Sequence, residues 1–167
     1  MFFKKYLPFI LAIASLLFLG GCLNTPPYAY RYRPGRSATL ENGFAVAPDR
    51  APENVRRAID AANRISTLPY KYGGGHRHLN DTGYDCSGAV SYVLNESGFL
   101  RGSMTSGEFR RYGKSGPGKW ISVYASDGHV FIVIADLRFD TGYGTGAKGP
   151  RWTTRSRTNK KYHVRHP

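Results

Sequence analysis

Residues 120–135 read WISVYASDGHVFIVIA, and this stretch decides the fold. Residues 121–125 alternate between apolar and more polar side chains, which is typical of a half-buried strand. Residues 129–135 are apolar on both faces and rich in β-branched side chains, so they predict a central strand. Asp127-Gly128 between the two runs is a strong signal for a tight turn. The stretch therefore predicts two strands joined by a tight turn, the second of them central in a sheet.

The sequence before this stretch has helical patterns instead. Residues 52–68 carry apolar side chains at helical spacing, residues 87–96 do the same, and residues 106–112 fit a short third helix. After the central strand, residues 138–141 and 162–165 are weaker strand candidates. Helices followed by strands predict an α+β domain, with N-terminal helices packed on one side of an antiparallel sheet.

The first 22 residues, MFFKKYLPFILAIASLLFLGGC, have the three parts of an export signal. Two lysines precede an uncharged apolar run, and two glycines end it, which predicts a signal peptide over residues 1–21. The alternative is a membrane-spanning helix, but that needs about 20 apolar residues and this run is shorter. Residues 19–22, Leu-Gly-Gly-Cys, resemble the bacterial lipobox, which implies lipidation of Cys22 and attachment to a membrane. Leu23 in place of Asp implies the outer membrane, facing the periplasm, if the source is Gram-negative.

The remaining length accommodates one domain and a linker. Residues 22–51 are rich in Pro, Tyr and Arg without a sustained period, and are interpreted as a lipidated N-terminus with a flexible tether. Residues 52–167 then form the domain. The net charge of the 167-residue chain is +13, which favours anionic partners such as wall polymer or lipid headgroups. Export argues against nucleic acid as a partner.

Cys86 is the candidate nucleophile. The chain has two cysteines, and lipidation of Cys22 would leave Cys86 unpaired in an exported protein. A buried structural cysteine is the alternative. However, Cys86 stands where the second helix begins, and the backbone dipole and free N–H groups at a helix start favour thiolate over thiol. The same N–H groups can receive the oxyanion that forms when a carbonyl is attacked.

A thiolate of this kind needs a base, usually an imidazole. His129 is the best candidate because it begins the central strand just after a turn. His163 and His166 lie in a basic tail. His76 and His78 lie beside a glycine-rich loop, and two histidines without a third ligand indicate a polar loop more often than a metal site.

Three motifs in order carry a resemblance to a known family. They are residues 69–74 (PYKYGG), residues 85–88 (DCSG) and residues 128–130 (GHV). Together they resemble the NlpC-type cell-wall cysteine peptidases over roughly residues 55–141. The resemblance implies a papain-like α+β domain that cuts peptide bonds in the peptidoglycan stem, often between γ-D-glutamate and the diamino acid. It implies no cofactor and no metal, and we expect a monomer.

The resemblance also implies roles for individual residues. Cys86 corresponds to the nucleophile and His129 to the general base. Tyr70 is expected to face the substrate or the oxyanion, and Asp85 and Ser87 are expected to line the cleft.

A third catalytic residue is less well defined by the sequence. The family usually places a polar residue about a dozen positions after the histidine, and Asp140 is nearest to that spacing. A carboxylate there would orient the imidazole and stabilise the imidazolium. A two-residue turn at Asp136-Leu137 would however pair Asp140 with Val133, roughly 13 Å along the strand from His129. Asp136 is the weaker rival for the role.

Three hypotheses for the function remain open. The leading one is a peptidoglycan endopeptidase. The second is an amidase or acyltransferase with the same cysteine–histidine chemistry, and the third is a non-catalytic wall-binding lipoprotein. Residues 142–151 resemble a phosphate loop only superficially, because the Gly-Lys-Ser/Thr ending is absent, and they are expected to form a wall of the cleft.

Overall fold

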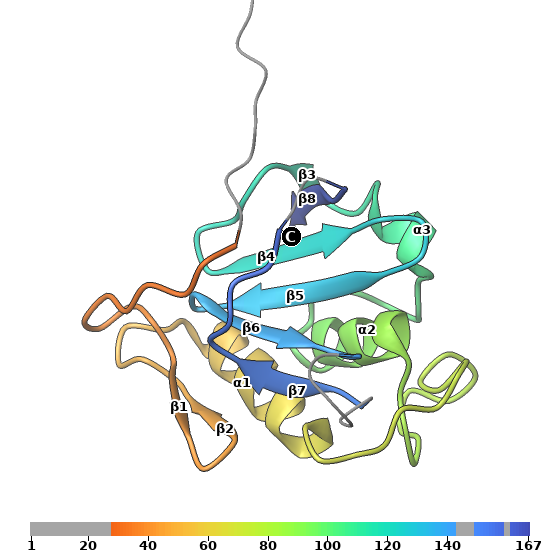
Figure 1. Cartoon of the computed structure of the whole chain (residues 1–167), viewed down its shortest axis with the longest axis horizontal. Coiled ribbons are helices and arrows are strands. Elements are labelled where there is room, and N and C mark those ends of the chain that lie inside the picture. The colour runs from red at the N-terminus through yellow and green to blue at the C-terminus, as the bar shows by residue number, and fades with distance from the viewer. Residues whose placement is uncertain (1–27, 143–148, 159–160) are drawn as a thin grey trace, which may run out of the picture.

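The computed structural model describes residues 28–142, 149–158 and 161–167 (Figure 1). Helices in these ranges are α1 (Glu53–Ile65), α2 (Cys86–Glu96) and α3 (Ser106–Phe109). Strands are β1 (Thr39–Glu41), β2 (Phe44–Val46), β3 (Lys114–Ser115), β4 (Ile121–Ala125), β5 (Val130–Ile134), β6 (Leu137–Asp140), β7 (Arg151–Thr153) and β8 (His163–His166). No helix of the described part is long and apolar enough to cross a membrane. The expected signal peptide and Cys22 lie outside the described residues.

The sheet is built around the hairpin that the sequence predicts. Six strands run in the order β3-β8-β4-β5-β6-β7, and every neighbouring pair is antiparallel. In the β4–β5 pair Ile121 faces Ile134 and Ala125 faces Val130. The Ser126 N–H donates to the His129 carbonyl at 2.8 Å and closes the turn at Asp127-Gly128. All five residues of β5 are buried, so it is the central strand expected from its composition.

The helices cover one face of this sheet, which confirms the α+β architecture. Helix α1 buries the apolar stripe predicted for it, from Val55 to Ile65. Helix α2 is buried almost throughout, lies beside α1 and packs against β5 (Figure 1). Asn63 ties these layers together because its side-chain amide bonds both backbone groups of Ala45 and accepts from the Trp152 indole N–H.

A second apolar cluster covers the opposite face of the sheet. The residues that form it correct one expectation from the sequence. Tyr28 packs there against Phe131, and its hydroxyl donates to the Asp136 carbonyl at 2.9 Å. Residues 28–51, expected as part of a flexible tether, are therefore packed on the domain and include the β1–β2 hairpin. Scattered hydrogen bonds, the Arg33–Asp136 ion pair and buried apolar side chains hold this segment, and its hairpin turns at Asn42-Gly43, with φ of 50° and 88°. Such contacts leave no periodic pattern in the sequence.

A second correction concerns the turn between β5 and β6. The turn lies at Ala135-Asp136, where φ is 45° and 65°, one residue earlier than expected. Val133 therefore pairs with Arg138 rather than with Asp140. Asp136 tolerates the left-handed conformation. It is also held there, because its carboxylate accepts from the Ser37 hydroxyl at 2.6 Å and from the Arg33 guanidinium.

Candidate active site

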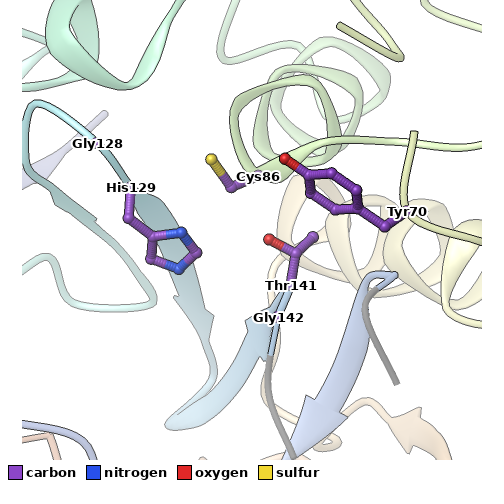
Figure 2. A pocket seen from close by; sticks show the side chains of 6 residues that line it. All are labelled: Tyr70, Cys86, Gly128, His129, Thr141 and Gly142. Carbon is purple, nitrogen blue, oxygen red and sulfur yellow. The ribbon is translucent and has the colours of Figure 1, made fainter. Parts of the chain in front are cut away.

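A cavity of about 280 Å³ lies where helix α2 meets the sheet. It brings together residues from four parts of the chain: Tyr70, Cys86, Gly128, His129, Thr141 and Gly142 (Figure 2). Cys86 comes from the first residue of α2, and His129 immediately precedes β5. Thr141 and Gly142 follow β6. Three residues singled out in the sequence, Tyr70, Cys86 and His129, thus share one cavity.

The start of α2 positions the sulfur of Cys86. Asp85 is the N-cap residue, and its Oδ1 accepts from the Gly88 N–H at 2.7 Å. Capping of this kind satisfies one of the unpaired N–H groups at a helix start. The Cys86 side chain is half-buried and points into the cavity in Figure 2. It is the free cysteine of the described residues.

Asp85 and Ser87 support the loop before the helix instead of lining the cavity. Asp85 Oδ2 accepts from the Gly73 N–H at 3.1 Å, and the Ser87 hydroxyl donates to Asp85 Oδ1 at 3.1 Å. His76 Nε2 lies 3.1 Å from Asp85 Oδ1 and 3.0 Å from Ser87 Oγ. Asp85 and Ser87 are buried, and the expectation that they line the cleft is corrected. His76 belongs to this polar cluster, as the loop interpretation predicted.

Gly88, two residues after Cys86, has no room for a side chain. A Cβ at this position would stand 1.8 Å from the carbonyl oxygen of Gly74, which is backbone and cannot swing aside. Replacing Gly88 by alanine should therefore push the 70–75 loop off the helix and destabilise the fold by about 3 kcal/mol. We expect a lower midpoint in urea and reduced activity of the protein that stays folded. Gly107→Ala is the matched control, because a Cβ there meets nothing within 4 Å. Equal midpoints for the two variants would contradict the argument.

His129 is oriented by a buried carboxylate. Its Nε2 lies 2.7 Å from Oδ1 of Asp140, whose side chain is fully buried. The earlier turn produces this contact. Because Ile132 faces Phe139, the residue after Phe139, which is Asp140, lies diagonally across the strand pair from His129. With Nε2 engaged, Nδ1 is the nitrogen available to Cys86. Figure 2 shows one ring nitrogen on the side that faces the sulfur.

Burial lowers the pKa of His129, but hydrogen bonds to Asp140 and Cys86, together with their negative charges, outweigh burial and raise it to about 9. Imidazolium is therefore favoured at neutral pH. The stabilisation from this pairing is complete below pH 6.5 and is lost as the pH rises through about 9.

Asp140→Asn tests this balance. The substitution removes the charge that raises the pKa and leaves burial, which lowers it, so the pKa of His129 should fall well below 9. Titration of the His129 ring by NMR would measure the change. Asp60→Asn is the control, because Asp60 is an exposed carboxylate on α1 and should leave the titration unchanged. A midpoint that stays near 9 in Asp140→Asn would show that Asp140 does not set the charge of His129.

Arg157 belongs to this site and was not anticipated from the sequence. Its Nη1 lies 2.6 Å from Oδ2 of Asp140, the oxygen that does not face His129. Arg138 Nε lies 3.4 Å from the same oxygen. The tail that contains Arg157 reads as an ordinary basic surface strand, and no local signal marks the residue.

Other candidates fall outside the cavity. Asp136, the rival third residue, lies in the β5–β6 turn with Arg33 and Ser37. His163 and His166 are on β8. Within the described residues no group of three His, Cys, Asp or Glu side chains is placed to hold a metal. Of the expected cleft wall, residues 143–148 lie outside the described residues, while Gly142 lines the cavity.

Comparison with known proteins identifies the fold. No family model and no curated protein matches the chain. Among solved structures, the peptidoglycan hydrolase RipB from Mycobacterium tuberculosis matches with a TM-score of 0.51 and 24% identity, over 70% of this chain and 68% of that one. The resuscitation promoting factor interacting protein RipA, in a form mutated at a cysteine, matches with a TM-score of 0.51 and 19% identity, over 78% and 70%. The fold is the papain-like α+β fold of NlpC-type domains, as the three motifs implied.

Proposed function

We propose that this chain is an NlpC-type cysteine peptidase that hydrolyses stem-peptide amide bonds of peptidoglycan. One observation carries the proposal. Cys86 at a helix start shares a cavity with His129, whose far nitrogen is held by the buried carboxylate of Asp140. A nucleophile, a base and a group that orients the base form a complete set for covalent acyl transfer.

The reaction follows from the positions of these groups. The Cys86 thiolate attacks the amide carbonyl, and the resulting oxyanion meets the N–H groups at the start of α2. The imidazolium of His129 gives its proton to the leaving amine, which departs as the thioester forms. His129, now neutral, takes a proton from water as the water attacks the thioester. The acid product leaves, and the thiolate–imidazolium pair is restored.

Tyr70 is proposed as a further donor to the oxyanion. Burial raises its pKa, and the charges of Cys86 and Asp85 raise it further, so the hydroxyl keeps its proton at neutral pH. Figure 2 shows this hydroxyl directed toward the Cys86 side of the cavity. A protonated hydroxyl at this place can donate to the oxygen on which charge develops.

Comparison with solved structures supports the substrate class. RipB is described as a peptidoglycan hydrolase. The RipA structures include forms mutated at a cysteine and at a histidine. This chain presents Cys86 and His129 in one cavity of the same fold.

The proposal includes export and a lipid on Cys22, with the outer membrane as the location if the source is Gram-negative. Tyr28 is already packed against the domain. Six residue steps separate Cys22 from Tyr28. Even fully extended they span only about 20 Å, so the anchored enzyme would act on wall strands close to the membrane.

Digestion of purified peptidoglycan tests the function. The full chain in mild detergent would carry Cys22→Ser, so that Cys86 is its one thiol, and half of the sample would be alkylated with iodoacetamide. The untreated sample should release new stem-peptide fragments, and their masses, read by mass spectrometry, would name the bond. The alkylated sample should release none. A folded, untreated sample that releases nothing would count against peptidoglycan as the substrate and return the amidase, acyltransferase and wall-binding hypotheses.

A further inference from the structure

Arg157 binds Oδ2 of Asp140, the carboxylate oxygen that does not face His129. Arg157 Nη1 lies 2.6 Å from Asp140 Oδ2, and Nη2 donates to the Tyr162 hydroxyl at 2.9 Å. The guanidinium carbon also lies 5.4 Å from the ring centre of Phe131 and 5.6 Å from that of Tyr162. Both ends of the guanidinium are thus engaged, and two neighbouring aromatic rings lie beside it.

The backbone at Arg157 is fixed as well. Its N–H donates to the Tyr28 carbonyl at 3.0 Å, as part of an antiparallel bridge between the two segments. Tyr28 is buried in the cluster that also contains Phe131. The backbone of Arg157 is therefore held in place against the domain, unlike that of an exposed tail residue.

We propose that Arg157 is a positioning residue of the active site, which turns the Asp140 carboxylate so that Oδ1 faces Nε2 of His129. The inference rests on the proposed cysteine chemistry and adds a fourth member to the Cys86–His129–Asp140 set. The terminal torsion of an aspartate is soft, so one hydrogen bond to His129 leaves it poorly defined. A second, charge-assisted bond on the other oxygen fixes it, and a planar guanidinium suits this geometry.

Arg138 does not duplicate this role. Its Nε lies 3.4 Å from Oδ2, beyond the distance of a strong charge-assisted bond, and its guanidinium lies over the Tyr28 and Phe131 rings. Arg138 contributes charge near Asp140, whereas Arg157 supplies the short directional contact.

Two opposing effects decide what removal of Arg157 does to His129. The groups that face His129 are Cys86 from α2, Asp140 from β6, and Tyr162, whose ring centre is 6.4 Å away. Loss of a nearby cation would raise the pKa of His129, while loss of a well-aimed carboxylate would lower it. The carboxylate is in direct contact at 2.7 Å and the guanidinium stands behind it. The carboxylate effect therefore dominates, and the imidazolium becomes less stable.

Arg157→Gln tests the proposal through the thiol as well as through activity. In the full chain carrying Cys22→Ser, we expect the NMR titration midpoint of the His129 ring to fall below about 9 and the rate of Cys86 alkylation by iodoacetamide at pH 7 to fall with it. Peptidoglycan cleavage should fall roughly 10- to 100-fold, the rate equivalent of losing one hydrogen bond to a charged group. Arg157→Lys keeps the charge without the fork and should recover only part of these effects. Lys161→Gln, an exposed cation of the same segment, should match the parent chain.

Tyr162→Phe provides a second variant if Arg157→Gln does not fold. It removes the partner of Nη2 alone and should lower the His129 midpoint in the same direction, with a fall of about threefold in the alkylation rate at pH 7. An unchanged His129 titration in a folded Arg157 or Tyr162 variant would overturn the positioning role. A lowered midpoint in an enzyme that leaves peptidoglycan intact would uphold the positioning role and refute only the substrate.

Discussion

Cys86→Ala is expected to abolish the proposed hydrolysis of peptidoglycan while leaving the protein folded. The expected loss is a thousandfold or more, to about the uncatalysed background, because no thioester can form without the sulfur. The fold should persist because Cys86 is half-buried and the cap on α2 is supplied by Asp85, which the substitution does not touch. Fragment release by mass spectrometry and thermal unfolding by circular dichroism would measure the two effects.

Cys86→Ser tests whether the ionisable sulfur itself is required. It keeps the shape and a hydrogen-bonding atom, but a serine hydroxyl does not ionise to share a proton with His129 as a thiol does. We expect it to be as inactive as Cys86→Ala. Both variants should still bind insoluble peptidoglycan, because the rest of the cavity is intact. Wild-type cleavage by Cys86→Ala would exclude Cys86 as the nucleophile.

Local signals predicted most of the architecture. The β4–β5 hairpin follows from Asp127-Gly128 and the alternation around it, and α1 follows from its apolar stripe. The residue types of Cys86 and His129 also predicted that the two side chains belong to one site. Strands β3 and β7 could not be predicted, because they lie at the sheet edges and are two and three residues long, too short for a pattern.

Placement of Asp140 shows how a small local error changes the site. A turn one residue later would set Asp140 opposite Val133, but the actual turn at Ala135-Asp136 places it within hydrogen-bonding distance of His129. The register depends on Asp136, whose carboxylate is held by Arg33 and Ser37 about 100 positions earlier in the chain. Such long-range contacts leave no periodicity in the sequence.

Residues beside a motif need not share the motif's role. Asp85 and Ser87 flank the nucleophile, and the family resemblance implied that they line the cleft. A helix start turns neighbouring side chains to different sides. Asp85 and Ser87 face the glycine loop and His76 while Cys86 faces the cavity. Their importance is therefore to hold the loop that carries Tyr70 against α2.

His129→Ala has the second largest expected effect and distinguishes a thiolate–imidazolium pair from an independently reactive thiol. With the imidazole gone, the group whose positive charge stabilises the Cys86 thiolate is lost, and no base activates water for the second step. Cleavage should fall about a thousandfold. Alkylation of Cys86 at pH 7 should slow, because the imidazolium that faces the sulfur is gone.

Two comparisons make the His129→Ala result interpretable. His163→Ala, at the exposed first residue of β8, should change neither rate, which controls for general loss of an imidazole. The double variant Cys86→Ala/His129→Ala should be no less active than either single variant, because groups that act as one unit are lost together. Losses that multiplied in the double variant would mean that Cys86 and His129 act independently. The carboxylate of Asp140 would then orient a base that acts apart from the sulfur, and the thiolate–imidazolium pair would not be the reacting unit.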